Sequence, residues 1–265
     1  MDKTIELVNN VKDIHAMPTV IVKALNIMKK PTASMKELGD IVMFDQSLTI
    51  KFLALVNSAY YGFSQQISSI NIALSLLGMV KVKNIIVAVA MKPMMSNQGD
   101  KELWKHSMRV ASGCEYLANL TKIMDSDEAF ISGFVHDVGK IVLHMTNDKL
   151  YSKVVELVDN GADILETERK YFDSDHVKTG SLLAKRWQLP ILLANTISYH
   201  HAPNLSSIPV PCNLVRFVDK LVQTNFNPNT VDKDFCNTLG IDFEDLEDLR
   251  KAIIQKAEVL ISELS

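Results

Sequence analysis

Apolar residues recur every three or four positions along most of this 265-residue chain, which is the spacing of one face of an α-helix. Residues 47–56 place Leu48, Phe52, Leu55 and Val56 on one such face. The same spacing near the C-terminus joins Leu246, Leu249, Ile253, Ala257, Leu260 and Leu264. Period-two alternation with Asn-Gly turns is absent. We therefore predict an all-α fold of roughly a dozen short helices.

Polar residues at the ends of these patterns predict helix boundaries. Thr32, Ser34 and Ser126 are expected N-caps, and Glu37 stands three residues after Ser34, as a capping box requires. Asn57 follows a strongly apolar helix. We expect its side chain to cap free carbonyl groups or to tie two parts of the chain together, rather than to contact a ligand.

The segment Pro93–Asp100 lacks helical periodicity and contains both Pro and Gly. It is the best candidate for a joint between two helical parts, residues 1–97 and residues 98–265. A second loop, Ala202–Pro211, contains three prolines. No internal repeat of fixed period is visible.

Composition narrows the classes of partner and compartment. The formal net charge is only −3 and the pI is about 6.2, so no basic field predicts a nucleic-acid partner or an anionic membrane surface. No apolar stretch approaches the roughly 20 residues of a membrane span, and the N-terminus lacks the apolar core of a signal peptide. Three widely separated cysteines indicate buried thiols in a reducing compartment. We expect a cytoplasmic protein.

Histidine marks the second half of the chain. Six of the seven histidines fall between residues 106 and 201. His136 directly precedes Asp137, and His200 directly precedes His201. Imidazole and carboxylate are the ligands that Zn, Mn and Fe prefer. The cluster therefore indicates a divalent-metal site.

Most single histidines in helical proteins pack in the core or face solvent. We assign that ordinary role to His15 and His144. The other histidines lie where a helix can direct them inward beside another candidate ligand. Lys140 shares a helix face with His136 and Asp137, because residues three or four apart are neighbours on a helix. The spacing permits a site, and the fold decides whether it forms.

Several segments resemble the HDOD domain family. They are Phe44–Thr49, Val56–Tyr61, Ile70–Gly78, Leu103–Ser107, Gly133–Lys140, His176 with Gly180, Trp187–Pro190 and Tyr199–Pro203. The likeness covers about residues 10 to 225. The segments Asn57–Ala59 and Trp187–Pro190 make it specific.

This resemblance implies a bacterial signalling module in which an HD-superfamily domain packs on an N-terminal helical bundle. The family is related to HD phosphohydrolases and to the HD-GYP phosphodiesterases of cyclic di-GMP. Many HDOD proteins have lost metal ligands and serve as regulatory or scaffolding domains. Here the HD-GYP ligand pattern is retained, at Glu102, His106, His136, Asp137, His176, His200, His201 and Asp219. The Asp-Gly-x-Gly-Tyr-Pro segment of that group is replaced by Ala202–Ser207.

The pattern implies one or two divalent cations (Fe, Mn or Zn), with Asp137 as the bridge between two ions. His106, His136 and Asp219 would complete one ion, and His176, His200 and His201 the other. Water held by such cations becomes a stronger nucleophile toward phosphorus. Lys140 would stabilise charge on a phosphate oxygen, so Lys140 and Asp137 are the candidate catalytic residues.

Some of these residues have ordinary alternatives. Glu102 also fits a solvated carboxylate in the first turn of a helix, and Lys140 also fits a surface lysine. Asp219 has alternative partners in Arg216 and Lys220.

Two functions compete. In the first, which we favour, the chain is a regulatory HDOD protein that retains a metal site and contacts a signalling protein or a small phosphorylated ligand. In the second, it is an active metal-dependent phosphohydrolase on a nucleotide or another phosphoester. The missing Gly-Tyr-Pro segment favours the first function, and the intact ligand set favours the second. A haem or redox-iron sensor has no motif of its own.

Overall fold

The computed structural model describes residues 2–11, 21, 23, 34–44, 46–96 and 102–264. All regular structure within these ranges is helical, which confirms the predicted all-α fold. The helices are α1 (Lys3–Asn10), α3 (Met35–Phe44), α4 (Gln46–Val56), α5 (Ile70–Leu77), α6 (Met79–Met95), α7 (Glu102–Thr121), α8 (Ser126–Val135), α9 (Gly139–Thr146), α10 (Asp148–Asp159), α11 (Ile164–Phe172), α12 (His176–Arg186), α13 (Ile191–Tyr199), α14 (Pro209–Leu221), α15 (Lys233–Leu239) and α16 (Leu246–Leu264), with short 3-10 turns at Pro203–Leu205, Pro228–Thr230 and Phe243–Asp245.

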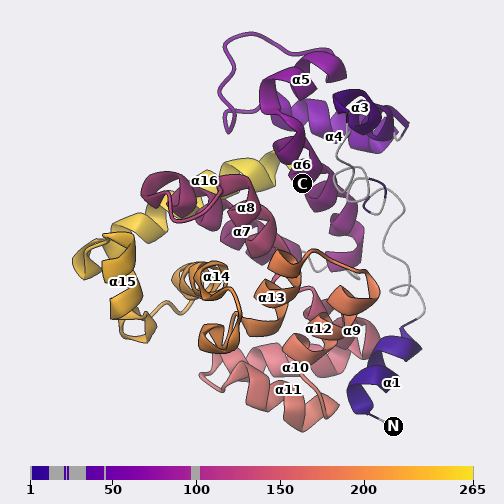
Figure 1. Ribbon diagram of the computed structural model, residues 1–265. Helices are drawn as coiled ribbons and strands as arrows, with labels where there is room; N and C mark the ends of the chain where they lie inside the picture. Colours follow the sequence, from indigo (N-terminus) through magenta and orange to yellow (C-terminus); the bar gives the residue numbers. More distant parts are fainter. Residues whose placement is uncertain are drawn as a thin grey trace.

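Helices α3, α4 and α5 form a small bundle at one end of the molecule, and α6 leads from it into the larger part (Figure 1). The predicted apolar face of α4 is buried, with Leu48 at 4% and Phe52 at 0% exposure. Helix α4 contacts α6 and the C-terminal helix α16. The bundle is therefore joined to the larger part by packing as well as by the chain.

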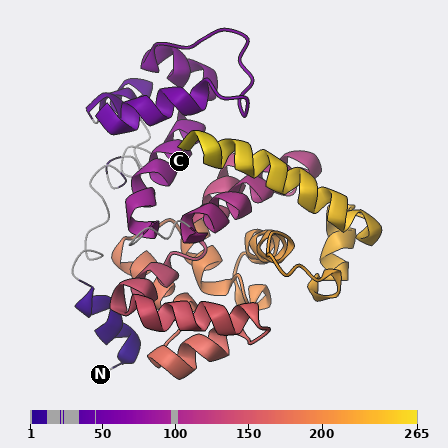
Figure 2. The same ribbon diagram turned by 180° about the vertical axis from the view of Figure 1, so that it is seen from behind.

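Helices α7 and α8 lie at the centre of the larger part and pack closely against each other. The long helix α16 runs along α7 and ends beside the N-terminal bundle, as seen from behind in Figure 2. Its predicted apolar face is confirmed, because Leu246, Ile253, Ala257, Leu260 and Leu264 are all buried. Helices α14 and α15 complete this side around a second apolar cluster.

Helices α9 to α13 form the layer on the opposite side of α8, and α1 packs on α9 and α12. The backbones of α9 and α12 approach very closely at Gly139. A Cβ atom added there would lie 1.9 Å from the carbonyl oxygen of His176. This contact brings the start of α9 beside the start of α12.

The predicted joint lies partly inside a helix. Helix α6 continues through Pro93 to Met95, and residues 97–100 lie outside the described ranges. One apolar cluster extends from Leu7 through Phe52 and Trp104 to Leu264, so the core crosses the expected boundary. The division at residue 97 stays a prediction.

The capping predictions had mixed outcomes. Ser34 and Glu37 exchange the two hydrogen bonds of a capping box, which confirms that prediction. The prediction for Ser126 was wrong by one residue, because the Asp125 side chain accepts the hydrogen bonds of the first turn. Asn57 caps as expected: its amide donates to the carbonyls of Leu53 and Ile67 and accepts from the Ile67 N–H. Thr32 lies outside the described residues.

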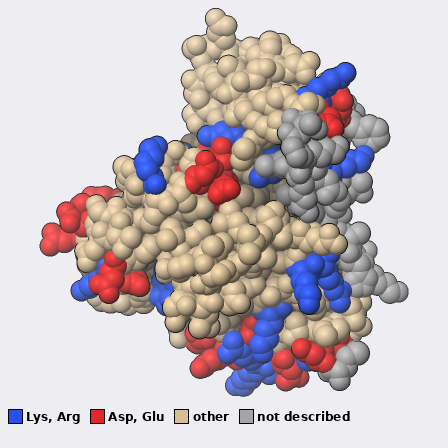
Figure 3. Space-filling model, in the orientation of Figure 1, with Lys and Arg blue, Asp and Glu red and all other residues tan. Residues whose placement is uncertain are grey.

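Two surface properties bear on function. No single helix in the described part of the chain is long and apolar enough to cross a bilayer, although the bent pair α5 and α6 reaches those limits when taken together. Residues 52–80 contain no Asp, Glu, Lys or Arg. The outer end of the N-terminal bundle is correspondingly poor in charged side chains (Figure 3).

Candidate metal centre

Five segments of the chain deliver the candidate ligands to one place between α7, α8, α12, α13 and α14. His106 comes from the second turn of α7 and Asp219 from the last turns of α14. His136 and Asp137 occupy the tight turn between α8 and α9. The remaining ligands lie at helix ends, with His176 as the first residue of α12 and His200-His201 directly after α13.

Local structure explains why these side chains point inward. The close approach of α9 to α12 at Gly139 sets the Asp137 turn against His176. Asp175 caps α12 through Lys178 N and also pairs with Arg169 at 2.6 Å, which holds the start of that helix in place. His136, Asp137, His176 and His200 are each no more than 1% exposed. Buried polar groups of this kind require partners.

One carboxylate oxygen of Asp137 faces a first group of ligands. Asp137 Oδ2 lies 3.1 Å from His136 Nε2 and 3.4 Å from His106 Nε2. Asp219 Oδ1 lies 3.1 Å from the same His106 nitrogen. Lys140 Nζ donates to Asp137 Oδ2 at 2.6 Å. We call His106, His136, Asp137 and Asp219 the solvent-facing half, because the His106 and Asp219 side chains are 23% and 12% exposed.

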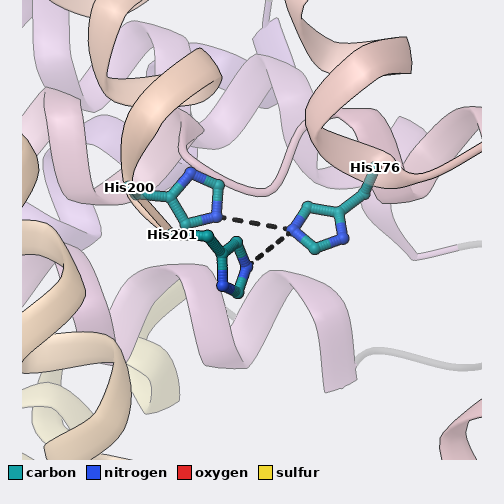
Figure 4. Close-up of side chains that lie close together, drawn as sticks. All are labelled: His176, His200 and His201. Carbon is teal, nitrogen blue, oxygen red and sulfur yellow. Dashed lines mark hydrogen bonds between the residues drawn. The ribbon is translucent and has the colours of Figure 1, made fainter. Parts of the chain in front are cut away.

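The other oxygen of Asp137 faces three histidines. Asp137 Oδ1 lies 3.4 Å from His176 Nε2 and 3.8 Å from His200 Nε2. The His176 nitrogen lies 3.4 Å from His200 Nε2 and 3.1 Å from His201 Nε2, so the three rings converge (Figure 4). We call His176, His200, His201 and Asp137 the three-histidine half. Asp137 thus lies between two groups of candidate ligand atoms.

The hydrogen bonds on the far side of the rings fix which nitrogen faces the centre. His136 Nδ1 lies 2.7 Å from the Gly133 carbonyl, and His200 Nδ1 lies 3.0 Å from the Thr196 carbonyl. His176 Nδ1 faces a carboxylate oxygen of Glu168 at 2.7 Å. A carbonyl or carboxylate only accepts, so each Nδ1 carries a hydrogen and each neutral ring presents the lone pair of Nε2.

The facing ring nitrogens need a positive charge between them. The Nε2 atoms of His176 and His200 lie 3.4 Å apart, so two neutral rings would direct both lone pairs inward and repel unless a proton or a metal cation lies between them. His106 Nε2 and His136 Nε2 are buried without a hydrogen-bond partner. Buried polar atoms rarely stay unpaired. The residues present therefore fit divalent cations with imidazole and carboxylate ligands.

The pKa shifts of His200, His201 and Asp137 also favour metal binding. Burial, reinforced by the neighbouring His201 and His136, holds the pKa of His200 well below its usual range. Burial, reinforced by His176, lowers the pKa of His201 to about 4. Burial alone would raise the pKa of Asp137, but His136 and Lys140 outweigh it and hold that pKa well below the usual range. Two neutral imidazoles and an ionised carboxylate are the ligand forms that a metal requires.

In the solvent-facing half, the pKa shifts likewise favour a positive charge between the two carboxylates. Burial alone would lower the pKa of His106, but the Asp137 and Asp219 carboxylates, which can accept from the protonated ring, raise that pKa to about 9. Burial would raise the pKa of Asp219, but its bond with His106 holds that pKa below the usual range. Without a metal, a proton on His106 thus occupies the place of a cation between two carboxylates.

The structure brings together all but one of the predicted site residues. Glu102 lies at the start of α7 with its side chain 65% exposed and paired with Lys105 at 2.6 Å. Among the described residues it belongs to neither group of converging ligand atoms. The alternative, a solvated carboxylate in the first helical turn, describes Glu102 in this structure. Its distance from the centre reflects its place on the outer face of the first turn.

The structure describes one of the two histidines to which we assigned an ordinary packing or surface role. His144 is mostly buried, its ring lies tilted against Tyr151 with centroids 4.1 Å apart, and it lies 3.2 Å from Asp148, so its packing role is confirmed. His15 lies outside the described residues. The three cysteines are free and buried, as predicted.

Sequence reasoning missed Glu168 and Tyr151. Glu168 is fully buried, accepts hydrogen bonds from His176, and accepts a third from the Tyr151 hydroxyl at 3.0 Å. One signal was available, because Glu168 stands at helical spacing between Ile164 and Phe172. A carboxylate on the apolar face of an amphipathic helix indicates a buried, partnered charge.

Comparison with known proteins places the chain in a family. The model of the HDOD domain matches residues 14–203. The chain belongs to the HDOD family. A curated but uncharacterised protein from Treponema pallidum is 25% identical over 231 residues, which are 80% of this chain and 44% of that protein. The chain thus spans less than half the length of that relative.

Solved structures share the same fold. An HDOD domain protein of unknown function from Geobacter sulfurreducens has a TM-score of 0.82 at 23% identity, covering 98% of this chain and 97% of that one. A candidate signal transduction protein from Marinobacter aquaeolei has a TM-score of 0.74 at 18% identity, covering 94% and 58%. A candidate metal-dependent phosphohydrolase from Shewanella amazonensis has a TM-score of 0.67 at 18% identity, covering 100% of both. At these identities the likeness establishes the HDOD fold alone.

Proposed function

We propose that this HDOD protein is a signal-transduction protein whose larger helical part holds two divalent cations. The position of Asp137 carries the proposal, because one oxygen faces His106 and His136 while the other faces the three-histidine half. The donor set suits Fe, Mn or Zn. The solved neighbours described as a signalling protein and as a metal-dependent phosphohydrolase support both parts of the proposal.

Elemental analysis tests the metal part directly. The chain is purified without chelator, and Fe, Mn and Zn are counted per chain before and after reloading with each metal alone. We expect more than one ion per chain after reloading with at least one of the three. A content near zero under every condition would contradict the proposal.

The signalling part predicts a protein partner, and the surface of α5 supports it. Ile72 and Leu76 lie one helical turn apart and are 54% and 51% exposed. They lie within residues 52–80, which carry no charge. Exposed apolar positions on an uncharged face favour contact with another protein. A small phosphorylated ligand at the metal centre is the other candidate input.

A second function, phosphoester hydrolysis, is favoured by Lys140. A divalent cation supplies polarisation of a phosphoryl oxygen and lowers the pKa of water in its coordination shell. Lys140 Nζ stands 2.6 Å from Asp137 Oδ2 with its side chain 20% exposed, so it reaches both the bridge and incoming substrate. Its ammonium group would stabilise negative charge that grows on a phosphoryl oxygen. His106 and Asp219 line the same exposed side.

Assays on a panel of phosphoesters with added Mn or Fe test this second function. Lys140→Ala should lower kcat by roughly 100-fold or more, the usual effect of removing one such donor, while metal content is retained. Lys149→Ala, an exposed lysine on α10, is the matched control and should keep full activity. Equal rates for Lys140→Ala and wild type would remove Lys140 from the reaction.

Cyclic di-GMP is expected to be a poor substrate. The segment after His201 is Ala202–Ser207, in which Pro203 begins a short 3-10 turn, in place of the Gly-Tyr-Pro element. Proline fixes φ and removes a hydrogen-bond donor at this rim. Robust cyclic di-GMP hydrolysis by wild type, lost in Asp137→Ala, would overturn the preference for a signalling role.

A further inference from the structure

The two halves of the centre differ in what supports their histidines. In the solvent-facing half, His136 Nδ1 meets the backbone carbonyl of Gly133. In the three-histidine half, His176 Nδ1 meets the carboxylate of Glu168 at 2.7 Å. A hydrogen bond to an ionised acceptor is shorter and roughly twice as strong as one between neutral groups. It also makes the opposite ring nitrogen a better metal ligand.

Glu168 lies in the core and is held toward His176 by several hydrogen bonds. Its side chain is fully buried, and it accepts from His176 Nδ1, from His176 N at 2.8 Å and from the Tyr151 hydroxyl at 3.0 Å. Among the described residues, its ion-pair partner is His176, and no Lys or Arg lies within ion-pair distance. A buried carboxylate needs a positive charge nearby. A proton on His176 supplies one in the metal-free chain, and a cation bound at the other nitrogen of that ring would take its place.

Lys140 disfavours cation binding in the solvent-facing half. Its ammonium group contacts Asp137 Oδ2, the oxygen that faces His106 and His136. A cation entering the solvent-facing half must share that oxygen with Lys140. Asp137 Oδ1, which faces His176 and His200, has no lysine or arginine within ion-pair distance among the residues that the structure describes.

We propose that the two halves bind cations unequally: the three-histidine half, supported by Glu168 and Tyr151, fills first and tightly, and the solvent-facing half fills second and exchanges. This inference rests on the proposed metal centre and adds an order of loading to it. Glu168 acts through His176 and is therefore a positioning residue. Occupancy of the solvent-facing half would then follow the concentration of available metal, so this half is the one through which metal supply would regulate the protein.

Titration of the metal-stripped chain with Mn²⁺ tests the proposal, with calorimetry for affinity and electron paramagnetic resonance for the site occupied. Wild type should show a tight first event with the spectrum of an isolated ion, followed by a weaker event with the spectrum of a coupled pair. Glu168→Gln keeps the shape of the side chain and removes its charge. It should weaken the first event by roughly 10- to 100-fold, as loss of an outer-shell partner does.

Three further variants make the assignment specific. Asp219→Asn should weaken the second event and leave the first unchanged. Glu166→Gln, an exposed residue on the same helix as Glu168, carries the same charge change and should match wild type. Tyr151→Phe retains the carboxylate and should weaken the first event by a smaller factor. It also serves as the test if Glu168→Gln does not fold.

Three outcomes would overturn the inference: two events of equal affinity in wild type, equal weakening of both events in Glu168→Gln, or weakening of the second event alone. A merely structural Glu168 would lower the melting temperature of the metal-free chain without changing the first event. Absence of any Mn²⁺ binding by wild type, together with no Fe or Zn content, would instead remove the proposed metal centre itself. The two failures are thus distinguishable.

Discussion

Asp137 directs one oxygen of its carboxylate toward each half of the proposed metal centre. The residue is 1% exposed and stands in a turn whose backbone makes the first hydrogen bond of α9. Its side chain therefore contributes to the site far more than to the helices around it. Substitution at this position separates metal binding from folding.

We expect Asp137→Ala to lose both cations, with an affinity loss above the roughly 10- to 100-fold that outer-shell substitutions cause. The helical signal in circular dichroism should remain close to wild type, because the apolar core residues that flank this turn, such as Val135 and Val138, are unchanged. Asp159→Ala, an exposed carboxylate on α10, is the control. Full metal content in Asp137→Ala would show that this residue is not the bridge.

Buried tyrosines predict a loss of stability at alkaline pH. Burial, followed by Glu115, raises the pKa of Tyr60 well above its usual value, and burial, followed by Glu168, does the same for Tyr151. Their unfolded forms release protons near pH 10 while the folded forms keep them. The unfolded state therefore binds fewer protons, so stability is complete below about pH 10 and falls as the pH rises above it.

Denaturant unfolding at about pH 9 and about pH 11 measures this effect, with tyrosinate absorbance recorded in parallel. Tyr60 and Tyr151 should ionise only as the protein unfolds. The double variant Tyr60→Phe, Tyr151→Phe should lose less stability between the two pH values than Tyr171→Phe does. Ionisation of every tyrosine together in the folded protein would refute the prediction.

At the scale of elements, the contact between α9 and α12 sets the distance between the Asp137 turn and His176. Gly139 permits this contact, because a Cβ there would meet the backbone of His176 at 1.9 Å and of Gly180 at 2.6 Å. Backbone atoms cannot rotate aside as the end of a side chain can. The two helices must separate if a side chain is added.

Gly139→Ala should therefore lower the free energy of unfolding by about 1–3 kcal/mol or more and weaken metal binding at the same time. Calorimetric melting and Mn²⁺ titration measure the two effects. Gly39→Ala is the control, since its Cβ would meet the flexible end of Leu74 and lies far from the centre in the chain. Unchanged metal affinity in a clearly destabilised Gly139→Ala would show that helix spacing does not control the site.

At the scale of the whole molecule, the proposed metal binding predicts a link between metal supply and folding stability. Each ion that binds the folded chain alone stabilises it by about 2.7 kcal/mol at a free concentration 100 times its dissociation constant. We expect a chelator to lower the melting temperature of the wild-type chain and leave the helical content largely intact, because one apolar cluster connects both parts. Asp137→Ala should not respond to chelator. An equal shift in wild type and variant would show that the chelator acts elsewhere.

The sequence by itself determined the fold class and the identities of most site residues. Helical periodicity is a local property, and faces such as Leu48-Phe52-Leu55 were predictable because each helix must bury one stripe. The ability of a side chain to bind a metal is equally local, because the His136 imidazole and the Asp137 carboxylate are potential ligands wherever the fold places them. Asn57 was predicted as a cap for the same reason.

Only the tertiary structure decided which of these residues meet. Spacing along one helix could not tell that Glu102 points outward while His106, one turn later, reaches Asp219 from a distant helix. Nor could it assign Glu168 to His176, because that contact depends on how two helices pack. Ligand identity belongs to single residues, whereas coordination and charge balance arise from distances between elements, and packing alone sets those distances.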